Sequence, residues 1–212
     1  MITLYTWKTP NGRKPAIMLE EIGIPYEVVG IDISKNEQFA PAFLAIAPNN
    51  KIPAMVDDDA FGGQTLSIFE SGAILTYLAE KTGRLLAASG PERYAALAWL
   101  NWQAGGLAPM LGQLGFYALR SEEKLPLAIT RFTDEAERLI GVMDKRLSAV
   151  PYLAGAEYSI ADIAAYPWTS AAAQMMTSVL GDAFKRATAV TAWLERVGTR
   201  PAVVRGMAVL QE

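Results

Sequence analysis

Glu70 and Ser71 are the residues of this sequence best placed to bind a small charged ligand. They stand at the start of the run SGAILTYLAEK, which predicts a helix over 71–81. The first turn of a helix exposes unpaired N–H groups and a partial positive charge, so it attracts a carboxylate, and the Ser71 hydroxyl adds a donor. Glu70 would hold an ammonium group. The pair therefore matches the amino-acid end of a ligand, with plain helix capping by Ser71 as the alternative.

Ile52 and Pro53 form a second candidate site, at the start of a predicted strand. A proline there can have a purely structural use, which is to protect the edge of a sheet. If the bond between them is cis, the N–H and C=O of Ile52 would face the ligand and pair with a peptide as an added strand would. The sequence alone does not decide between the cis and trans forms.

Thr9 and Asn11 form a third candidate site, at the opening of the first predicted helix. Their side chains are neutral donors near a positive helix end, which favours an anion such as a thiolate. Lowering a thiol pKa by about 2 units from roughly 8.5 requires about 2.7 kcal/mol. One donor to a charged acceptor contributes about 1.5–3 kcal/mol, so the magnitudes permit this role. Helix capping is again the alternative.

The sequence contains no cysteine and no histidine. It therefore cannot use a Ser-His-Asp triad, a protein thiolate or the usual nitrogen and sulfur metal ligands. Any redox sulfur must come from a ligand. The acidic run Asp57-Asp58-Asp59 lies in a predicted turn and is interpreted as solvated charge, so no metal is expected.

Length and charge restrict the function further. With 212 residues, 51% of them hydrophobic, the chain can form two modest domains. The 19 basic and 22 acidic residues give 19 − 22 = −3, without a long run of either sign, so neither nucleic acid nor an anionic membrane is an expected partner. No signal-peptide pattern and no uncharged apolar stretch of 18 residues is present, and we expect a cytoplasmic protein.

The pattern of apolar residues predicts a two-domain α+β protein. In the first domain, 1–84, strands alternate with helices before a final hairpin and helix, which favours a parallel βαβ unit within a mixed sheet. Its expected elements are a strand at 2–6, a helix that starts between 11 and 14 and ends at Gly23, a strand at 26–33, a short helix at 38–46, strands at 53–57 and 64–69, and a helix at 71–81.

A linker at 87–91 precedes an all-helical second domain, 90–212. Its expected elements are a helix at 93–119 interrupted by Gly105-Gly106 and Pro109, a helix at 125–150, a helix that begins at a Ser159–Asp162 capping box and is kinked at Pro167, a helix at 182–197, and an irregular or short helical tail from Arg200-Pro201.

Five motifs carry a family resemblance that spans nearly the whole chain. They are TPNG at 9–12, PNNKIPA at 48–54, FESGAIL at 69–75, QAGGLAPMLGQ at 103–113 and YSIADIA at 158–164. In this order they resemble the cytosolic glutathione S-transferases, in which a thioredoxin-like domain precedes an all-α bundle. Within these the chain is most similar to the bacterial nu class, the glutathione-dependent disulfide-bond oxidoreductases.

The resemblance implies a site for each part of glutathione. It implies that Pro53 is cis, that Ile52 pairs with the cysteinyl backbone, and that Glu70 and Ser71 hold the γ-glutamyl end. The remaining implied site residues are Thr9 and Asn11 near the sulfur, Gln38 and Lys51 near the glycyl end, and Arg131 at a second bound glutathione.

The resemblance also implies chemistry that fits a chain without cysteine. Bound glutathione attacks a small disulfide, a mixed disulfide forms, and a second glutathione resolves it. Glutathione or its disulfide, a small disulfide or electrophilic substrate, and a second subunit of a homodimer are the implied partners, with weak peroxidase or conjugating activity as a side reaction. Tyr5 lies inside the first strand and is interpreted as a packing residue.

Two other functions remain open at this stage. One is a conventional transferase that conjugates electrophiles, and the other is a non-catalytic glutathione-binding regulatory protein, for which an added polar arm would be expected. The segment LGFYALRSEE at 114–123 departs from the resemblance. Its Phe116 and Tyr117 would either make the second-substrate side more apolar or pack in the core or a dimer interface.

Overall fold

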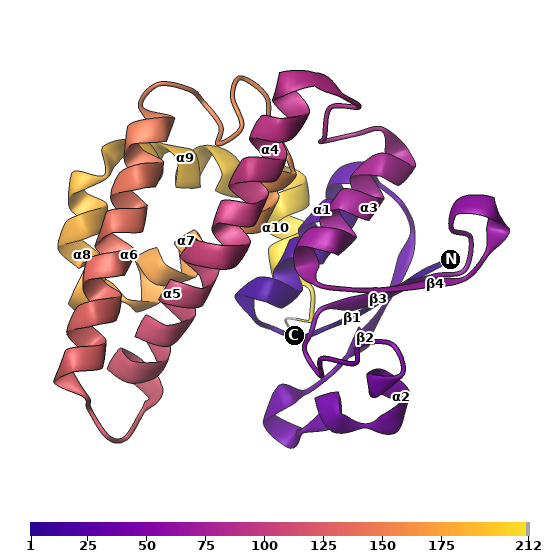
Figure 1. Ribbon diagram of the computed structural model, residues 1–212, viewed down its shortest axis with the longest axis horizontal. Helices are drawn as coiled ribbons and strands as arrows, with labels where there is room; N and C mark the ends of the chain where they lie inside the picture. The colour runs from indigo at the N-terminus through magenta and orange to yellow at the C-terminus, as the bar shows by residue number, and fades with distance from the viewer. Residues whose placement is uncertain (211–212) are drawn as a thin grey trace. The chain divides into compact units, whose positions relative to one another are not determined.

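The computed structural model describes residues 1–210 and divides into two compact units (Figure 1). One unit contains Met1–Ala88 together with the chain from Arg200, and the other contains Ser89–Thr199. The sequence-based division put everything from residue 90 onward in the second domain. In the structure, helix α10 (Pro201–Ala208) instead packs against α1 (Pro10–Ile22) of the first unit. Gly206 permits this packing, since a Cβ there would lie 2.5 Å from the Ile17 Cα.

A four-stranded mixed sheet forms the centre of the first unit. Its strands are β1 (Ile2–Thr6), β2 (Tyr26–Gly30), β3 (Ala54–Asp57) and β4 (Leu66–Phe69). They lie in the order β2-β1-β3-β4. β1 pairs in parallel with β2 and antiparallel with β3, and β3 pairs antiparallel with β4. The predicted βαβ unit, final hairpin and α+β class are therefore confirmed.

Helices cover both faces of this sheet. α1 and α3 (Ser71–Thr82) lie together on one face, and α2 (Pro41–Leu44) lies on the other (Figure 1). Because side chains alternate along a strand, the buried Leu4 and the half-buried Tyr5 face opposite sides. Tyr5 packs against Phe43 of α2 with ring centroids 6.3 Å apart, which confirms its packing role.

Two predicted elements of the first unit are shorter than expected. The strand predicted at 26–33 ends at Gly30, because the Asp32 side chain accepts from the Ser34 N–H (3.0 Å) and starts the 3-10 turn Ile33–Lys35. The helix predicted at 38–46 is divided into the 3-10 turn Glu37–Phe39 and α2, which begins at a proline. A third 3-10 turn, Phe61–Gly63, joins β3 to β4.

The second unit is entirely helical. Its α-helices are α4 (Gly90–Trp102), α5 (Ala108–Leu114), α6 (Pro126–Leu147), α7 (Ile160–Met175), α8 (Thr177–Arg186) and α9 (Thr188–Gly198). The predicted interruption near Gly105 is a π-helical segment, Gln103–Leu107, and a second one, Gly115–Arg120, follows α5. Pro167 lies inside α7.

The single helix predicted at 182–197 is wrong, since α8 and α9 are separate helices. Ala187 between them has ψ 68° and leaves the helical conformation. Asp144 of α6 accepts hydrogen bonds from the N–H groups of Ala189 (2.9 Å) and Val190 (3.2 Å), so it caps the new helix from another part of the chain. A cap supplied across 45 residues leaves no local signal in the sequence.

The capping box at the start of α7 is confirmed. The Ser159 hydroxyl accepts from the Ala161 N–H, and Asp162 accepts from the Ser159 N–H at 3.1 Å. Asp162 is fully buried and also accepts from the indole N–H of Trp193 at 2.9 Å. Burial raises the pKa of this carboxyl, while these donors oppose the rise.

Candidate functional site

Six of the nine predicted site residues line one cavity in the first unit. The cavity has a volume of about 170 Å³. Its lining residues are Asn11, Lys51, Ile52, Pro53, Phe69, Glu70 and Ser71. They come from the start of α1, the segment before β3, and the junction of β4 with α3, so three distant parts of the sequence meet there.

The first turn of α1 is fixed to the end of β1. Gly12 allows the close approach, because a Cβ there would collide with the Trp7 carbonyl and lie 2.5 Å from Thr6 Oγ1. The Thr6 hydroxyl donates to the Gly12 carbonyl at 2.8 Å. Asn11, the neighbour of Gly12, is thereby held at the cavity wall.

Thr9 is the N-cap of α1, and its Oγ1 accepts from the Gly12 N–H at 3.2 Å. Thr9 therefore caps the helix, which was the alternative interpretation of this residue. It does not line the cavity. A hydroxyl can accept and donate at once, so capping leaves its hydrogen for another acceptor. The role of Thr9 beside a bound sulfur stays a prediction.

The bond between Ile52 and Pro53 is cis, as the resemblance implied. Both residues line the cavity. The ladder between β1 and β3 begins at Ala54, so the N–H and C=O of Ile52 lie outside it. This backbone therefore offers a donor and an acceptor beside the cavity, just before the first residue of β3.

Glu70 occupies an unusual backbone conformation at the N-cap of α3, with φ 72° and ψ 119°. A non-glycine residue pays about 1–3 kcal/mol for such a conformation, which is retained mainly at functional sites. The side chain makes no capping hydrogen bond, and Ser71 is the first helical residue rather than the cap. The capping alternative is therefore not realised here, and the first N–H groups of α3 have no side-chain cap.

The remaining predicted residues lie apart from this lining. Gln38 is half-buried in a 3-10 turn, and its Oε1 finds no hydrogen-bond partner among residues 1–210. Arg131 belongs to α6 of the second unit, where its side chain is 63% exposed and lies 3.9 Å from Glu135. The assignments of both residues to glutathione stay predictions.

Phe116 and Tyr117 lie in the second π-helical segment. Tyr117 stacks on Phe132 of α6, with ring centroids 5.6 Å apart and planes 12° from parallel. Phe116 packs edge-on against Tyr117 and is 45% exposed. Tyr117 thus packs within its own unit, while the exposed face of Phe116 is available to a ligand or a partner.

Sequence reasoning missed Phe69 in the cavity lining and the buried Lys14 on α1. Phe69, the last residue of β4, lines the cavity and is 38% exposed. Lys14 lies one turn beyond Asn11 and is only 1% exposed. Burial lowers the pKa of Lys14 to about 7, and the charge of Glu70 opposes this change. The available signal was a lysine directly before the apolar run PAIML, on a helix already assigned to the site.

The acidic run at 57–59 is not uniformly solvated, which corrects the expectation. Asp57 is 1% exposed and accepts from the Tyr77 hydroxyl (2.7 Å) and the Lys81 ammonium (2.6 Å). Lys81 also donates to the Asp59 carbonyl.

Across residues 1–210, no group of three or more acidic side chains is arranged to hold a metal ion. Nor does any helix in that range have the length and apolar character needed to cross a membrane.

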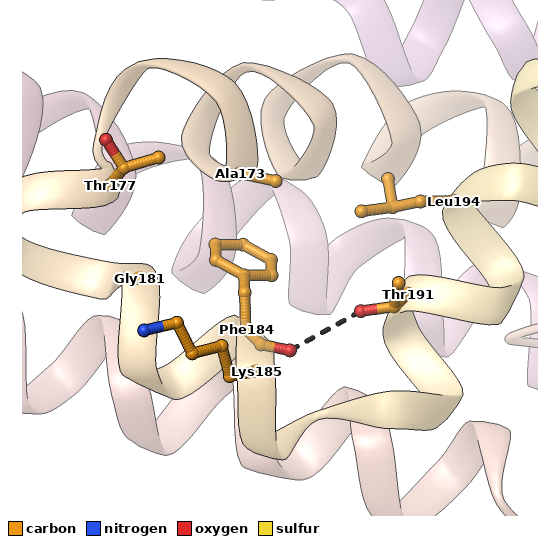
Figure 2. A pocket seen from close by; sticks show the side chains of 7 residues that line it. All are labelled: Ala173, Thr177, Gly181, Phe184, Lys185, Thr191 and Leu194. Atoms are coloured by element: carbon orange, nitrogen blue, oxygen red, sulfur yellow. Dashed lines mark hydrogen bonds between the residues drawn. The ribbon is translucent and has the colours of Figure 1, made fainter.

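A larger cavity of about 480 Å³ lies in the second unit, between α7, α8 and α9 (Figure 2). Ala173, Phe184 and Leu194 supply apolar side chains to its lining, and the Thr191 hydroxyl donates to the Phe184 carbonyl at 3.4 Å. Lys185 on its rim pairs with Asp182 at 2.9 Å. The lining has no carboxylate to hold an ammonium group, so the cavity beside Glu70 fits a zwitterionic ligand better.

Comparison with known proteins agrees with this fold. The family model "Glutathione S-transferase, N-terminal domain" matches residues 1–80, and "Glutathione S-transferase, C-terminal domain" matches residues 126–196. The disulfide-bond oxidoreductase YfcG of Escherichia coli strain K12 is 48% identical over 212 residues, which cover 100% of this chain and 95% of YfcG.

Two solved structures are similar over almost the whole chain. A glutathione transferase family member from Pseudomonas fluorescens, with two glutathione bound, has a TM-score of 0.93 and 42% identity, covering 97% of this chain and 92% of its own. A glutathione transferase from Pseudomonas putida, with one glutathione disulfide per subunit, has a TM-score of 0.94 and 41% identity. The match covers 99% of this chain and 91% of the Pseudomonas putida chain. The chain belongs to the glutathione S-transferase family.

Proposed function

We propose that this protein is a glutathione-dependent thiol:disulfide oxidoreductase. The observation that carries the proposal is the meeting of Glu70, Ser71 and the Ile52 backbone with Asn11 around one cavity, in a chain without cysteine. The similarity to YfcG supports the same activity. Bound glutathione supplies the redox sulfur that the protein lacks.

Each part of glutathione has a matching group in the cavity. The γ-glutamyl ammonium binds the Glu70 carboxylate, and its carboxylate binds the N–H groups and hydroxyl at the start of α3. The cysteinyl backbone pairs with the N–H and C=O of Ile52. Lys51 binds the glycyl carboxylate, and Gln38, whose Oε1 lacks a partner among the described residues, supports that end.

These contacts direct the cysteinyl sulfur toward the opening of α1. There Asn11 and the hydroxyl hydrogen of Thr9 donate to the thiolate, and the helix end adds a partial positive charge. The three together favour ionisation of the thiol, which is the form that attacks a disulfide.

The reaction then needs two glutathione molecules. The first thiolate attacks one sulfur of the substrate, so the substrate S–S bond breaks, a mixed disulfide forms and one substrate thiolate leaves. The second glutathione thiolate attacks the glutathione sulfur of the mixed disulfide, which yields glutathione disulfide and the other substrate thiolate. Each departing thiolate takes up one proton, equal to the two lost by the glutathione thiols. Arg131 is the proposed contact for the second glutathione.

The finer assignments belong to the same proposal. The five quoted motifs support the nu class, and family architecture supports a homodimer. Consumption of reduced glutathione fits a reducing compartment such as the cytoplasm. Conjugation of electrophiles and reduction of peroxides are expected as minor activities of the same thiolate.

Glutathione-dependent reduction of a small symmetrical disulfide tests the proposal. Wild-type protein should exceed the uncatalysed rate by orders of magnitude, and the double variant Thr9→Ala, Asn11→Ala should lose most of that gain. Equal rates for the two proteins would remove the assigned thiolate site. Faster turnover of an electrophilic aromatic halide than of the disulfide would favour a conventional transferase instead.

A further inference from the structure

Asn11 and Gly12 form an asparagine–glycine pair at the wall of the cavity. Asparagine is a thermolabile residue, and it loses its side-chain amide most readily when glycine follows, because glycine has no side chain to hinder ring closure. No other asparagine of the sequence precedes a glycine. The other asparagines are Asn36, Asn49, Asn50 and Asn101. Asn11 is therefore the asparagine of this chain with the greatest intrinsic tendency to deamidate.

Deamidation of Asn11 would begin at the backbone nitrogen of Gly12. This nitrogen loses its proton and attacks the Asn11 Cγ, so a new C–N bond forms, the bond from Cγ to the amide nitrogen breaks, and ammonia leaves. The proton that the nitrogen loses is matched by the one that ammonia gains. Water then opens the cyclic imide at either of its carbonyls, which yields aspartate or isoaspartate. Water is the only co-reactant, and no electrons are transferred.

The hydrogen that the Gly12 nitrogen must lose is held by Thr9. Gly12 lies in the first turn of α1, where the helix itself provides no acceptor for an N–H group. The Thr9 Oγ1 accepts from this N–H at 3.2 Å. An N–H held in a hydrogen bond loses its proton less readily. The helical backbone of Asn11 also directs this nitrogen away from the carbon that it would attack.

The other side of Gly12 is fixed as well. The Thr6 hydroxyl donates to the Gly12 carbonyl at 2.8 Å in a buried hydrogen bond, and a Cβ on Gly12 would collide with the Trp7 carbonyl. Pro10 restricts the backbone directly before Asn11. Asn11 takes part in an interaction of its own, which adds to these restraints. Ring closure therefore requires the first turn of α1 to open.

Burial does not protect this peptide bond from water. Asn11 lines the cavity, and both Asn11 and Thr9 are partly exposed. Water can therefore reach the Asn11 amide in the folded protein. What opposes the reaction is the conformation of the first turn and the hydrogen bonds that maintain it.

We propose that Asn11 is a latent deamidation site, and that the N-cap hydrogen bond of Thr9 keeps its amide intact in the folded protein. The reaction proceeds through the fraction of molecules in which the first turn of α1 has opened. Removing an N-cap raises that fraction, so the rate at Asn11 should increase by about 2- to 30-fold without Thr9. This role of Thr9 does not depend on any ligand.

Deamidation would also change the cavity wall. The Asn11 amide, a neutral donor, would become a carboxylate that repels an anion, and isoaspartate would add a methylene to the backbone of α1. Disulfide reductase activity should therefore decline in step with the modified fraction. This decline rests on the proposed function, whereas the chemical change at Asn11 does not, so the two fail separately.

Mass spectrometry of residue 11 tests the proposal. Folded wild-type protein is incubated at pH 8 in water enriched in heavy oxygen, then digested with pepsin at acidic pH in ordinary water, so that heavy oxygen marks only the deamidation of the incubation. Folded protein should keep its amide over a period in which the same protein, unfolded in guanidinium chloride, loses most of it. Equal rates in the folded and unfolded protein would overturn the proposal.

Three variants isolate the contribution of Thr9. Thr9→Ala should deamidate at Asn11 about 2- to 30-fold faster than wild type, and Thr9→Ser, which keeps the hydroxyl, should stay close to wild type. Thr191→Ala removes an exposed hydroxyl in the second unit and should match wild type. A Thr9→Ala rate equal to that of wild type would overturn the role of the cap.

Hydrogen exchange of the Gly12 N–H in wild-type protein provides a second measurement, which decides the matter even if Thr9→Ala does not fold. The proposal expects this N–H to exchange more slowly than in the unfolded chain, because it is held by Thr9 until the first turn opens. Exchange as fast as in the unfolded chain would overturn the proposed protection.

Discussion

At the scale of single residues, Glu70 combines an unusual backbone conformation with a place in the cavity lining. Its backbone has a positive φ without the freedom of glycine, and it closes neither a capping box nor a helix cap. Folding retains such a conformation only when the surroundings enforce it. The cavity-lining position of the carboxylate accounts for its presence here better than any stabilising contact does.

Replacing this carboxylate with its neutral isostere tests its role. Glu70→Gln should bind S-methylglutathione about 10- to 150-fold more weakly, because a hydrogen bond to a charged group contributes about 1.5–3 kcal/mol. Calorimetry measures the change. Glu27→Gln, which alters an exposed acid on β2, serves as the matched control and should bind like wild type. Affinity within twofold of wild type for Glu70→Gln would place the ligand ammonium elsewhere.

At the scale of elements, Gly12 determines how closely the first turn of α1 approaches β1. Gly12→Ala should destabilise the protein by about 1–3 kcal/mol, because the added Cβ collides with the Trp7 carbonyl and backbone must move. The same movement shifts Asn11, so disulfide reductase activity should fall as well. Thermal unfolding and the disulfide assay measure the two effects.

Gly105→Ala is the matched control for this substitution. A Cβ at Gly105 meets nothing within 4 Å, so alanine there should leave stability unchanged or raise it by up to about 1 kcal/mol. If both glycine variants behave alike, close contact between α1 and β1 is not what positions the site.

Asp57 joins β3 to α3, and its contribution depends on pH. Burial alone would raise the pKa of its carboxyl, but hydrogen bonds from Lys81, Tyr77 and the Asp59 N–H outweigh this and lower the pKa. A lowered folded-state pKa stabilises the protein above the unfolded value of about 3.9 and loses that effect as the pH falls through the folded value. Asp57→Asn should therefore reduce the free energy of unfolding at pH 7 by about 1–3 kcal/mol.

The difference between wild type and Asp57→Asn should shrink as the pH drops below about 4, since the unfolded wild-type chain there takes up a proton that folded Asp57 binds only at still lower pH. Denaturant unfolding at pH 7, 5 and 3.5 measures it. Asp58→Asn, at the exposed neighbour, should show no comparable loss at any of these pH values. A constant difference across the three values would mean that the charge on Asp57 is not what stabilises β3 against α3.

Elements with local signals could be predicted from the sequence, and those with distant causes could not. Gly83 ends α3 in a left-handed conformation, and Ser159 opens α7, both as their residue types indicate. The division of α8 from α9 depends on Asp144, which lies in another helix. Six of the residues that line the cavity were predicted, five from their types at the starts of predicted elements and Lys51 from the family resemblance. Lys14 was missed because periodicity gives no account of a charge inside an apolar face.

At the scale of the whole molecule, the absence of cysteine means that no thiol of the protein takes part in the redox chemistry. In the proposed reaction the chain positions and ionises a sulfur, and electrons pass only between glutathione and the substrate. The protein itself therefore has no thiol to oxidise and no oxidised state to recycle. Every sulfur in the reaction arrives and leaves with a small molecule.

Treatment with a thiol-alkylating reagent tests this separation directly. Protein incubated with excess iodoacetamide, then freed of the reagent and supplied with fresh glutathione, should reduce a disulfide at its original rate, because the sequence offers no thiolate for alkylation. Alkylating the glutathione in a parallel sample should abolish the reaction. A time-dependent loss of protein activity that S-methylglutathione prevents would mean that a nucleophile of the chain takes part in catalysis. Full retention would locate the reacting sulfur in the ligand alone.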